Sequence, residues 1–164
     1  MLRRTALLAI CLLATGCPKA GGAYEQGNYG GSVDRGETQG RMFDFVSNKP
    51  DGDDWQIRVR GDSIWASYSN EDESDELPTK LLSKKETNKV WELIDKIEIP
   101  DRKKGRKDED EGYVYLRLRE PSAEEGYDIF ETYISRATED EDVIELAEYL
   151  RDLITKYHKE KPNF

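Results

Sequence analysis

Few side chains in this sequence could do covalent chemistry. Its 164 residues include 2 cysteines and 1 histidine, against 35 aspartates and glutamates. His158 is the one residue that could serve as the base of a Ser-His-Asp or Cys-His arrangement. It falls in the polar end of a predicted terminal helix, where we expect it to face solvent or to complement the helix dipole.

The same residue counts argue against a metal centre. Histidine and cysteine are too few for a zinc ligand cluster, and the acidic segment 48–54 lacks the ligand spacing of an EF-hand loop. Paired carboxylates can hydrolyse glycosides, but with 35 acids in the chain their proximity in sequence carries no information. We therefore predict no cofactor, no metal and no enzymatic activity, and keep a carboxylate-dependent hydrolase as an alternative.

Cys17 is the thiol whose surroundings point to a reaction. Arg3 and Arg4 precede an apolar run over residues 5–14, and small residues follow. A transmembrane helix needs about 20 apolar residues, so this run is too short to span a bilayer. It has the charged start, apolar core and small residues of an export signal. Cys11 lies inside the apolar core and is expected to leave with the signal peptide.

Leu13-Ala14-Thr15-Gly16-Cys17 resembles the lipobox of bacterial lipoproteins, in which small or aliphatic residues lead to Gly or Ala and then Cys. The resemblance implies that the Cys17 sulfur receives a diacylglyceryl group and that cleavage follows Gly16. Each buried CH₂ contributes about 0.8 kcal/mol, so two or three acyl chains anchor firmly. A plain secretory cut that leaves an ordinary thiol is one alternative, and an uncleaved N-terminal membrane helix is another.

The resemblance also implies a location. In Gram-negative lipoproteins, Asp after the lipidated Cys favours retention in the inner membrane. Pro18 occupies that place here, which implies the outer membrane, facing the periplasm, for a Gram-negative source. The predicted partners are thus the lipid bilayer, through acylated Cys17, and an envelope protein.

Charge and composition divide the chain further. The formal net charge is −10, and an acidic chain is poorly suited to nucleic acid, because phosphate contacts need clustered Lys and Arg. Glycines recur through residues 18–40, as in a tether. We predict a signal peptide over 1–16, the lipidated Cys and tether over 17–40, and a single domain over 41–164.

Alternation of apolar and polar residues predicts strands. The predicted strands are 42–46, 55–60, 63–69, 113–119 and 127–134. Gly61-Asp62 suits a hairpin turn. The polar segments 70–76 and 102–112 are expected to be solvated loops; contact of the second with anionic lipid is the alternative reading.

Two helices are predicted from apolar residues at helical spacing. One begins at a capping box formed by Ser83 and Glu86 and ends before Pro100; the other begins at a capping box formed by Thr138 and Glu141. We expect an α+β domain with an antiparallel sheet of about four to five strands and both helices on one face. Its order is strand, hairpin, helix, hairpin, helix.

Aromatic side chains on the outward strand faces are the candidate contact surface, although aromatic residues on strands more often simply pair across the sheet. They are Trp65, Tyr113, Tyr115, Tyr127 and Tyr133. We expect a non-catalytic binding or structural domain facing the periplasm. The hairpin-helix-hairpin-helix order also resembles emfourin-type metalloprotease inhibitors, which makes a protease-inhibitor-like module the alternative.

Overall fold

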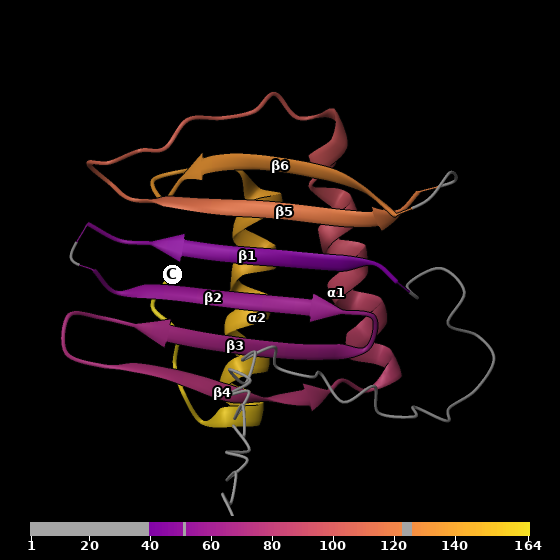
Figure 1. Cartoon of the computed structure of the whole chain (residues 1–164), viewed down its shortest axis with the longest axis horizontal. Helices are drawn as coiled ribbons and strands as arrows, with labels where there is room; N and C mark the ends of the chain where they lie inside the picture. The colour runs from indigo at the N-terminus through magenta and orange to yellow at the C-terminus, as the bar shows by residue number, and fades with distance from the viewer. Residues whose placement is uncertain (1–39, 51, 123–125) are drawn as a thin grey trace, which may run out of the picture. The chain divides into compact units, whose positions relative to one another are not determined.

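The computed structural model describes residues 40–50, 52–122 and 126–164. The elements are β1 Met42–Asn48, β2 Asp54–Arg60, β3 Ser63–Ser69, β4 Ser74–Leu81, α1 Lys84–Lys96, η1 Ile99–Asp101, β5 Tyr113–Pro121, β6 Tyr127–Ser135 and α2 Glu141–His158. Neighbouring strands are antiparallel, and the sheet order is β4-β3-β2-β1-β5-β6. β1 is thus a central strand, with β2 on one side and β5 on the other (Figure 1).

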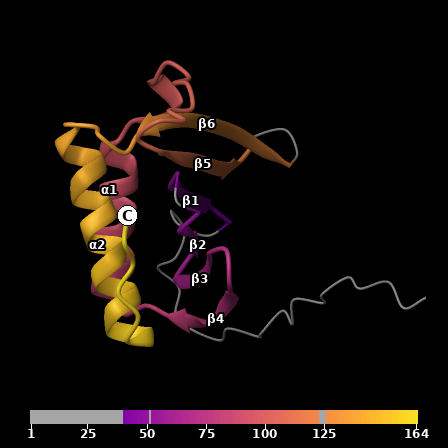
Figure 2. The ribbon, with the colours of Figure 1, turned by 90° about the vertical axis from the view of Figure 1, so that its left-hand side faces the viewer.

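The predicted fold class is confirmed, and the predicted strand count is wrong. The domain is α+β, with both helices against one face of an antiparallel sheet (Figure 2). The sheet has six strands rather than four or five.

The missed strand is β4, part of which was expected to be a solvated loop. It lies at the edge of the sheet and pairs with β3 alone. Leu77 is its one buried residue, so no alternating apolar pattern marks it. Pro78 also argues against a strand, but an edge strand tolerates proline because its outer N–H groups need no partner.

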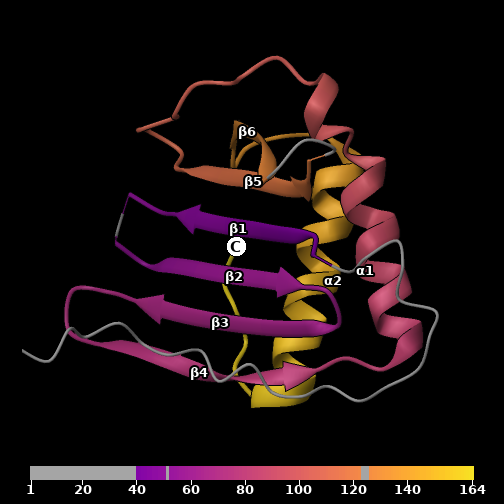
Figure 3. The same cartoon turned by 45° about the vertical axis from the view of Figure 1, so that its right-hand side comes forward.

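The core lies between the sheet and the two helices, which run side by side across the strands (Figures 2 and 3). The helical spacing identified most of the inward residues correctly, although Ala147 and Tyr157, expected on the apolar stripe of the second helix, are only partly buried. Those that the structure buries are Val90, Leu93, Ile94, Ile97, Val143, Leu146, Leu150, Leu153 and Ile154. Neither helix in the described ranges is long and apolar enough to cross a membrane.

The predicted capping box of α1 is confirmed. The Glu86 N–H donates to Ser83 Oγ over 3.4 Å, and the Ser83 N–H donates to the Glu86 carboxylate over 2.9 Å. Lys156 and Tyr157 of α2 donate to the same carboxylate over 2.6 and 2.9 Å. Burial alone would raise the pKa of Glu86, but these donors lower it to about 2. One carboxylate therefore joins the start of α1 to the end of α2.

The predicted capping box of α2 is wrong. Asp140 is the N-cap, and its carboxylate accepts from the N–H groups of Asp142 and Val143 over 3.2 and 3.3 Å. The Thr138 hydroxyl accepts instead from the Asp140 N–H over 3.2 Å. Because Thr138 stabilises the turn before the helix, it is not available to cap the helix itself.

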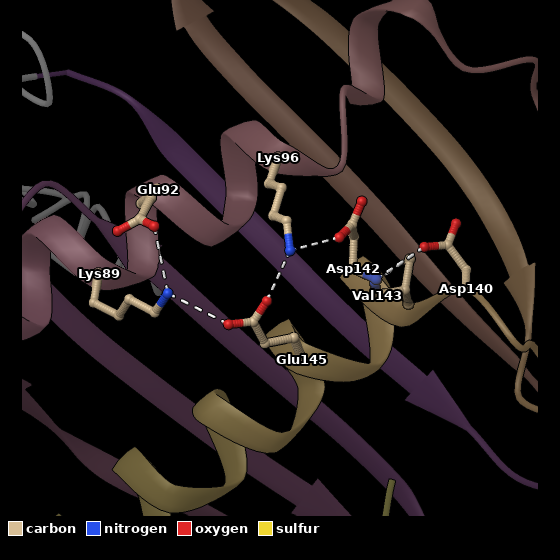
Figure 4. Close-up of polar contacts among 7 residues, drawn as sticks. All are labelled: Lys89, Glu92, Lys96, Asp140, Asp142, Val143 and Glu145. Atoms are coloured by element: carbon tan, nitrogen blue, oxygen red, sulfur yellow. Dashed lines mark hydrogen bonds and ion pairs between the residues drawn. The ribbon is translucent and has the colours of Figure 1, made fainter.

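Ion pairs link the exposed sides of the two helices. Lys96 lies 2.8 Å from Asp142 and 3.0 Å from Glu145, and Lys89 lies 3.4 Å from both Glu92 and Glu145 (Figure 4). These side chains are largely accessible to water, where such pairs contribute about 0–1 kcal/mol each. They therefore add little to the stability of the fold.

The segment 102–112 lies along the free edge of β6. The Gly105 N–H donates to the buried Thr132 hydroxyl over 3.1 Å, and Lys104 pairs with Glu131. A Cβ placed on Gly105 would overlap the carbonyl oxygen of Tyr133. This glycine therefore permits the close approach of the segment to the strand.

Replacing Gly105 with alanine should separate this segment from β6. The methyl group meets backbone atoms, which cannot rotate away, so we expect a loss of about 1–3 kcal/mol in the free energy of unfolding. Trypsin should then cleave the basic stretch 102–107 at least several-fold faster. Arg106→Lys, which keeps a trypsin site at an exposed position, is the control. Equal cleavage rates for the two variants would contradict the packing described.

Candidate functional site on the helix-free face

The sheet face opposite the helices carries rows of aligned side chains. We call it the helix-free face, because no helix of the described residues covers it (Figure 2). One cross-strand row reads Trp65, Arg58, Asp44, Arg117, Glu131, from β3 through β6. The next row reads Ser63, Arg60, Met42, Arg119, Ile129. Arginines on β2 and β5 therefore flank β1 on both sides.

Asp44 is the centre of this arrangement. It is 1% exposed and accepts from Arg58 Nε over 2.6 Å, from Arg117 Nε over 3.0 Å and from Arg119 Nη2 over 2.9 Å. Burial alone would raise the pKa of the Asp44 carboxyl, but the hydrogen bonds and charges of these arginines lower it. Asp44 is thus a buried, ionised group that holds three guanidinium groups in place.

A cluster of tyrosines occupies the β5–β6 side of the same face. The Tyr133 ring lies 5.6 Å from the Tyr113 ring and 5.1 Å from the Tyr115 ring, measured between centroids. The Lys107 ammonium group lies over Tyr113 and Tyr133. Tyr115 donates to Glu131 over 2.7 Å, and burial together with this carboxylate raises the pKa of Tyr115 to about 12. The Tyr115 hydroxyl group is therefore held in place as a hydrogen-bond donor to Glu131.

The strand register places all five predicted contact aromatics on the helix-free face but does not gather them into one patch. Tyr113, Tyr115 and Tyr133 form the cluster just described. Trp65 lies apart on β3, where Arg58 stacks 5.6 Å from its ring centroid. Tyr127 is exposed at the start of β6. Cross-strand pairing thus explains three of the five; of the other two, Trp65 is half-buried beside Arg58 and Tyr127 is exposed.

The arginines were missed as a site. A signal exists: β2 and β5 each carry two arginines two residues apart, Arg58 and Arg60 on one and Arg117 and Arg119 on the other. The sequence does not reveal that β1 lies between these strands, nor that Asp44 faces both pairs.

A polar depression of about 320 Å³ lies at the turn end of β1 and β2. Two of its three carboxylates are engaged by neighbours: Asp54 accepts from the Asn48 side chain over 2.7 Å, and Asp108 accepts from the Ser135 hydroxyl over 2.6 Å. Within the described ranges, no group of three or more His, Cys, Asp or Glu residues is placed to hold a metal ion. The depression therefore offers no evident catalytic arrangement.

His158 belongs to the other side of the molecule, at the end of α2. It is half-buried rather than solvent-facing, and its Nε2 is buried without a hydrogen-bond partner among the described residues. Burial, and secondarily the charge of Lys80, lowers the pKa of His158. His158, the last residue of α2, is therefore not part of the helix-free face.

Gly16 and Cys17, the predicted cleavage and lipidation sites, lie outside the described residues. No protein-family model and no curated protein matches this chain. Function must therefore be inferred from the motif at Cys17 and from the chemistry of the helix-free face.

Proposed function

We propose that this protein is a bacterial lipoprotein, anchored in the cell envelope through acylated Cys17, whose domain binds an envelope component without turnover. For a Gram-negative source, Pro18 favours the outer membrane, with the domain facing the periplasm. The domain would bind through its helix-free face, and the polypeptide before it would serve as the tether.

The arginine and aromatic content of the helix-free face is the observation that carries the binding role. Arginine, tyrosine and tryptophan are the residues enriched in the energetic centres of protein interfaces. Here they lie on a sheet face that no helix of the described residues covers. Asp44 and Glu131 already hold several of them by hydrogen bonds. Side chains fixed in this way lose little further entropy on binding.

The anchor is tested by replacing Cys17 with alanine. The variant should move from the membrane fraction to the soluble fraction, and its mass should lack acyl chains, because no thiol remains for the lipid. Cys11→Ala, which changes the other cysteine of the chain, should stay lipidated and membrane-bound. Sedimentation of the Cys17 variant with membranes would refute the lipid anchor.

The binding face is tested with a photo-crosslinking amino acid placed at single positions of the full-length protein in cells. Tyr133 and Trp65 report on the helix-free face, and the half-buried Tyr149 of α2 is the matched control. We expect a discrete cross-linked species from the first two positions and none from Tyr149. Equal cross-linking yields from all three positions would refute a binding role for this face. If the cross-linked protein is a metalloprotease, the alternative of a protease inhibitor is favoured.

A further inference from the structure

We propose that Arg58, Arg60, Arg117 and Arg119 form a phosphate-binding site, and that its ligand is the phosphate group of a phosphorylated saccharide. We call these residues the arginine quartet. The inference rests on the proposed use of the helix-free face for binding and names the ligand chemistry that this face would take.

Strand register sets the geometry of the quartet. Arg58 and Arg60 project from β2, and Arg117 and Arg119 project from β5, with β1 between the two strands. Adjacent strands lie about 4.8 Å apart, and residues i and i+2 lie about 7 Å apart along a strand. The four side chains therefore arise from the corners of a rectangle of about 10 by 7 Å. A single phosphate group can reach several of them at once.

The charge of the quartet suits a multiply charged anion. Four guanidinium groups face two carboxylates, those of Asp44 and Glu131, so two positive charges are in excess. This excess lies within a chain of net charge −10. A phosphate monoester carries about −1.5 to −2 charges at neutral pH and three acceptor oxygens. It matches the excess better than a carboxylate does.

The quartet also has unused donors. Arg119 Nε is buried and has no hydrogen-bond partner among the described residues. The Arg60 side chain is exposed and forms neither a hydrogen bond nor an ion pair within the described part of the chain. Met42, which lies between these two arginines in the row, supplies no competing acceptor side chain. An anion above Met42 would therefore have the unpaired guanidinium group of Arg60 on one side and the incompletely hydrogen-bonded guanidinium group of Arg119 on the other.

Partial burial favours a discrete ligand over a membrane surface. Arg58, Arg117 and Arg119 are only 29%, 34% and 21% exposed, and their hydrogen bonds to Asp44 hold them in place. Guanidinium groups fixed in this way suit bidentate recognition of phosphate oxygens. Attraction to a bilayer surface relies instead on basic side chains that reach the headgroups.

The neighbours of the quartet favour a sugar as the carrier of the phosphate. The half-buried Trp65 ring lies beside Arg58, and a sugar ring can place its apolar face against an indole. Ser63, Ser67 and Gln56 lie on the same face next to Trp65 and Arg58. Their hydroxyl and amide groups can hydrogen-bond sugar hydroxyl groups. A phosphosaccharide would thus use both the charge and the aromatic ring.

The experiment uses the full-length protein in detergent at constant ionic strength. Inorganic phosphate, glucose 6-phosphate and glucose are titrated separately, and the arginine Nε–H and tryptophan indole N–H resonances are followed by NMR. We expect saturable shifts with both phosphates and at least tenfold tighter binding of glucose 6-phosphate. Glucose should bind at least a hundredfold more weakly than its phosphate.

The double substitution Arg60→Gln and Arg119→Gln should weaken phosphate binding at least tenfold. Arg106→Gln removes an exposed arginine outside the sheet and should change it less than twofold. Arg60→Gln alone, which breaks no side-chain hydrogen bond or ion pair within the described residues, should weaken binding at least threefold, so the test survives if the double variant unfolds.

Three outcomes would overturn the inference. No saturable shift with either phosphate, or equal weakening by Arg106→Gln, removes the site. Equal affinity for inorganic phosphate and glucose 6-phosphate removes the saccharide. Face-specific cross-links from Tyr133 and Trp65 without phosphate binding would leave the proposed binding function intact and reject only the ligand class.

Discussion

Replacing Asp44 with alanine should lower the free energy of unfolding by about 3 kcal/mol. Removing one partner of a buried ion pair typically costs about 3–5 kcal/mol, because the remaining charge is left uncompensated. Asp44 is 1% exposed and accepts hydrogen bonds from three arginines. These arginines retain partial access to water, which places the expected loss at the lower end of that range.

Chemical denaturation followed by circular dichroism would measure the Asp44 effect. Asp110→Ala, in the exposed part of segment 102–112, removes the same type of side chain and should change stability by less than about 0.5 kcal/mol. A loss below about 1 kcal/mol for the Asp44 variant would show that the arginines do not depend on this carboxylate.

The Asp44 variant should also be less sensitive to acid. The pKa of Asp44 is lowered in the folded state, so its contribution is fully present above the unfolded pKa of about 3.9 and is lost as pH falls through the folded pKa. Glu86 behaves in the same way over the interval from 4.5 to about 2. Because Glu86 is retained, the variant should keep part of its acid sensitivity. An unchanged slope of stability against pH would contradict the role assigned to Asp44.

Replacing Phe45 with alanine should lower the free energy of unfolding by about 3–5 kcal/mol, the range for removing a buried aromatic side chain. Phe45 is completely buried in the central strand and lies between Ile57 and Leu116 on the neighbouring strands. Its ring centroid lies 4.9 Å from that of Phe164. Truncation would leave a cavity that the paired strands on both sides prevent from closing.

Val46 offers the control for Phe45. It is the next residue of β1, and its side chain lies on the opposite, helix-free face between Gln56 and Tyr115. Val46→Ala should cost less than about 1.5 kcal/mol. Measured in urea, comparable losses for the two variants would show that the core does not lie on the helix side of β1.

Local patterns explain which parts of the fold the sequence predicts. The apolar face of α1 and its capping box involve residues that lie three or four positions apart in the sequence. Local residues such as Ser83, Glu86, Val90 and Ile94 therefore suffice to predict this helix. β4 was missed because an edge strand with one buried residue, Leu77, has no apolar alternation. Thr138 was assigned to the wrong cap because the turn before α2 uses its hydroxyl.

The arginine site could not be predicted, because its contacts are remote in sequence. Asp44 meets Arg58, Arg117 and Arg119 across separations of 14, 73 and 75 residues. The segment Phe43-Asp44-Phe45 places a charged residue between two apolar residues. It does not indicate which residues pair with that charge. Only the order of strands around β1 brings them together. Cys17 is the opposite case, since five consecutive residues carry the whole lipobox prediction.

The two edges of the sheet differ in a way that matters for molecules crowded together. β6 is shielded by the segment 102–112, whereas no strand among the described residues pairs with the outer side of β4. Pro78 removes one N–H donor from β4. Beside this proline, the pairing register of β3 and β4 shifts, between Ile64 and Ala66 on β3. Prolines, bulges and charges at an open edge discourage the growth of intermolecular β-structure. Copies held at high density in one plane would therefore resist fibril formation.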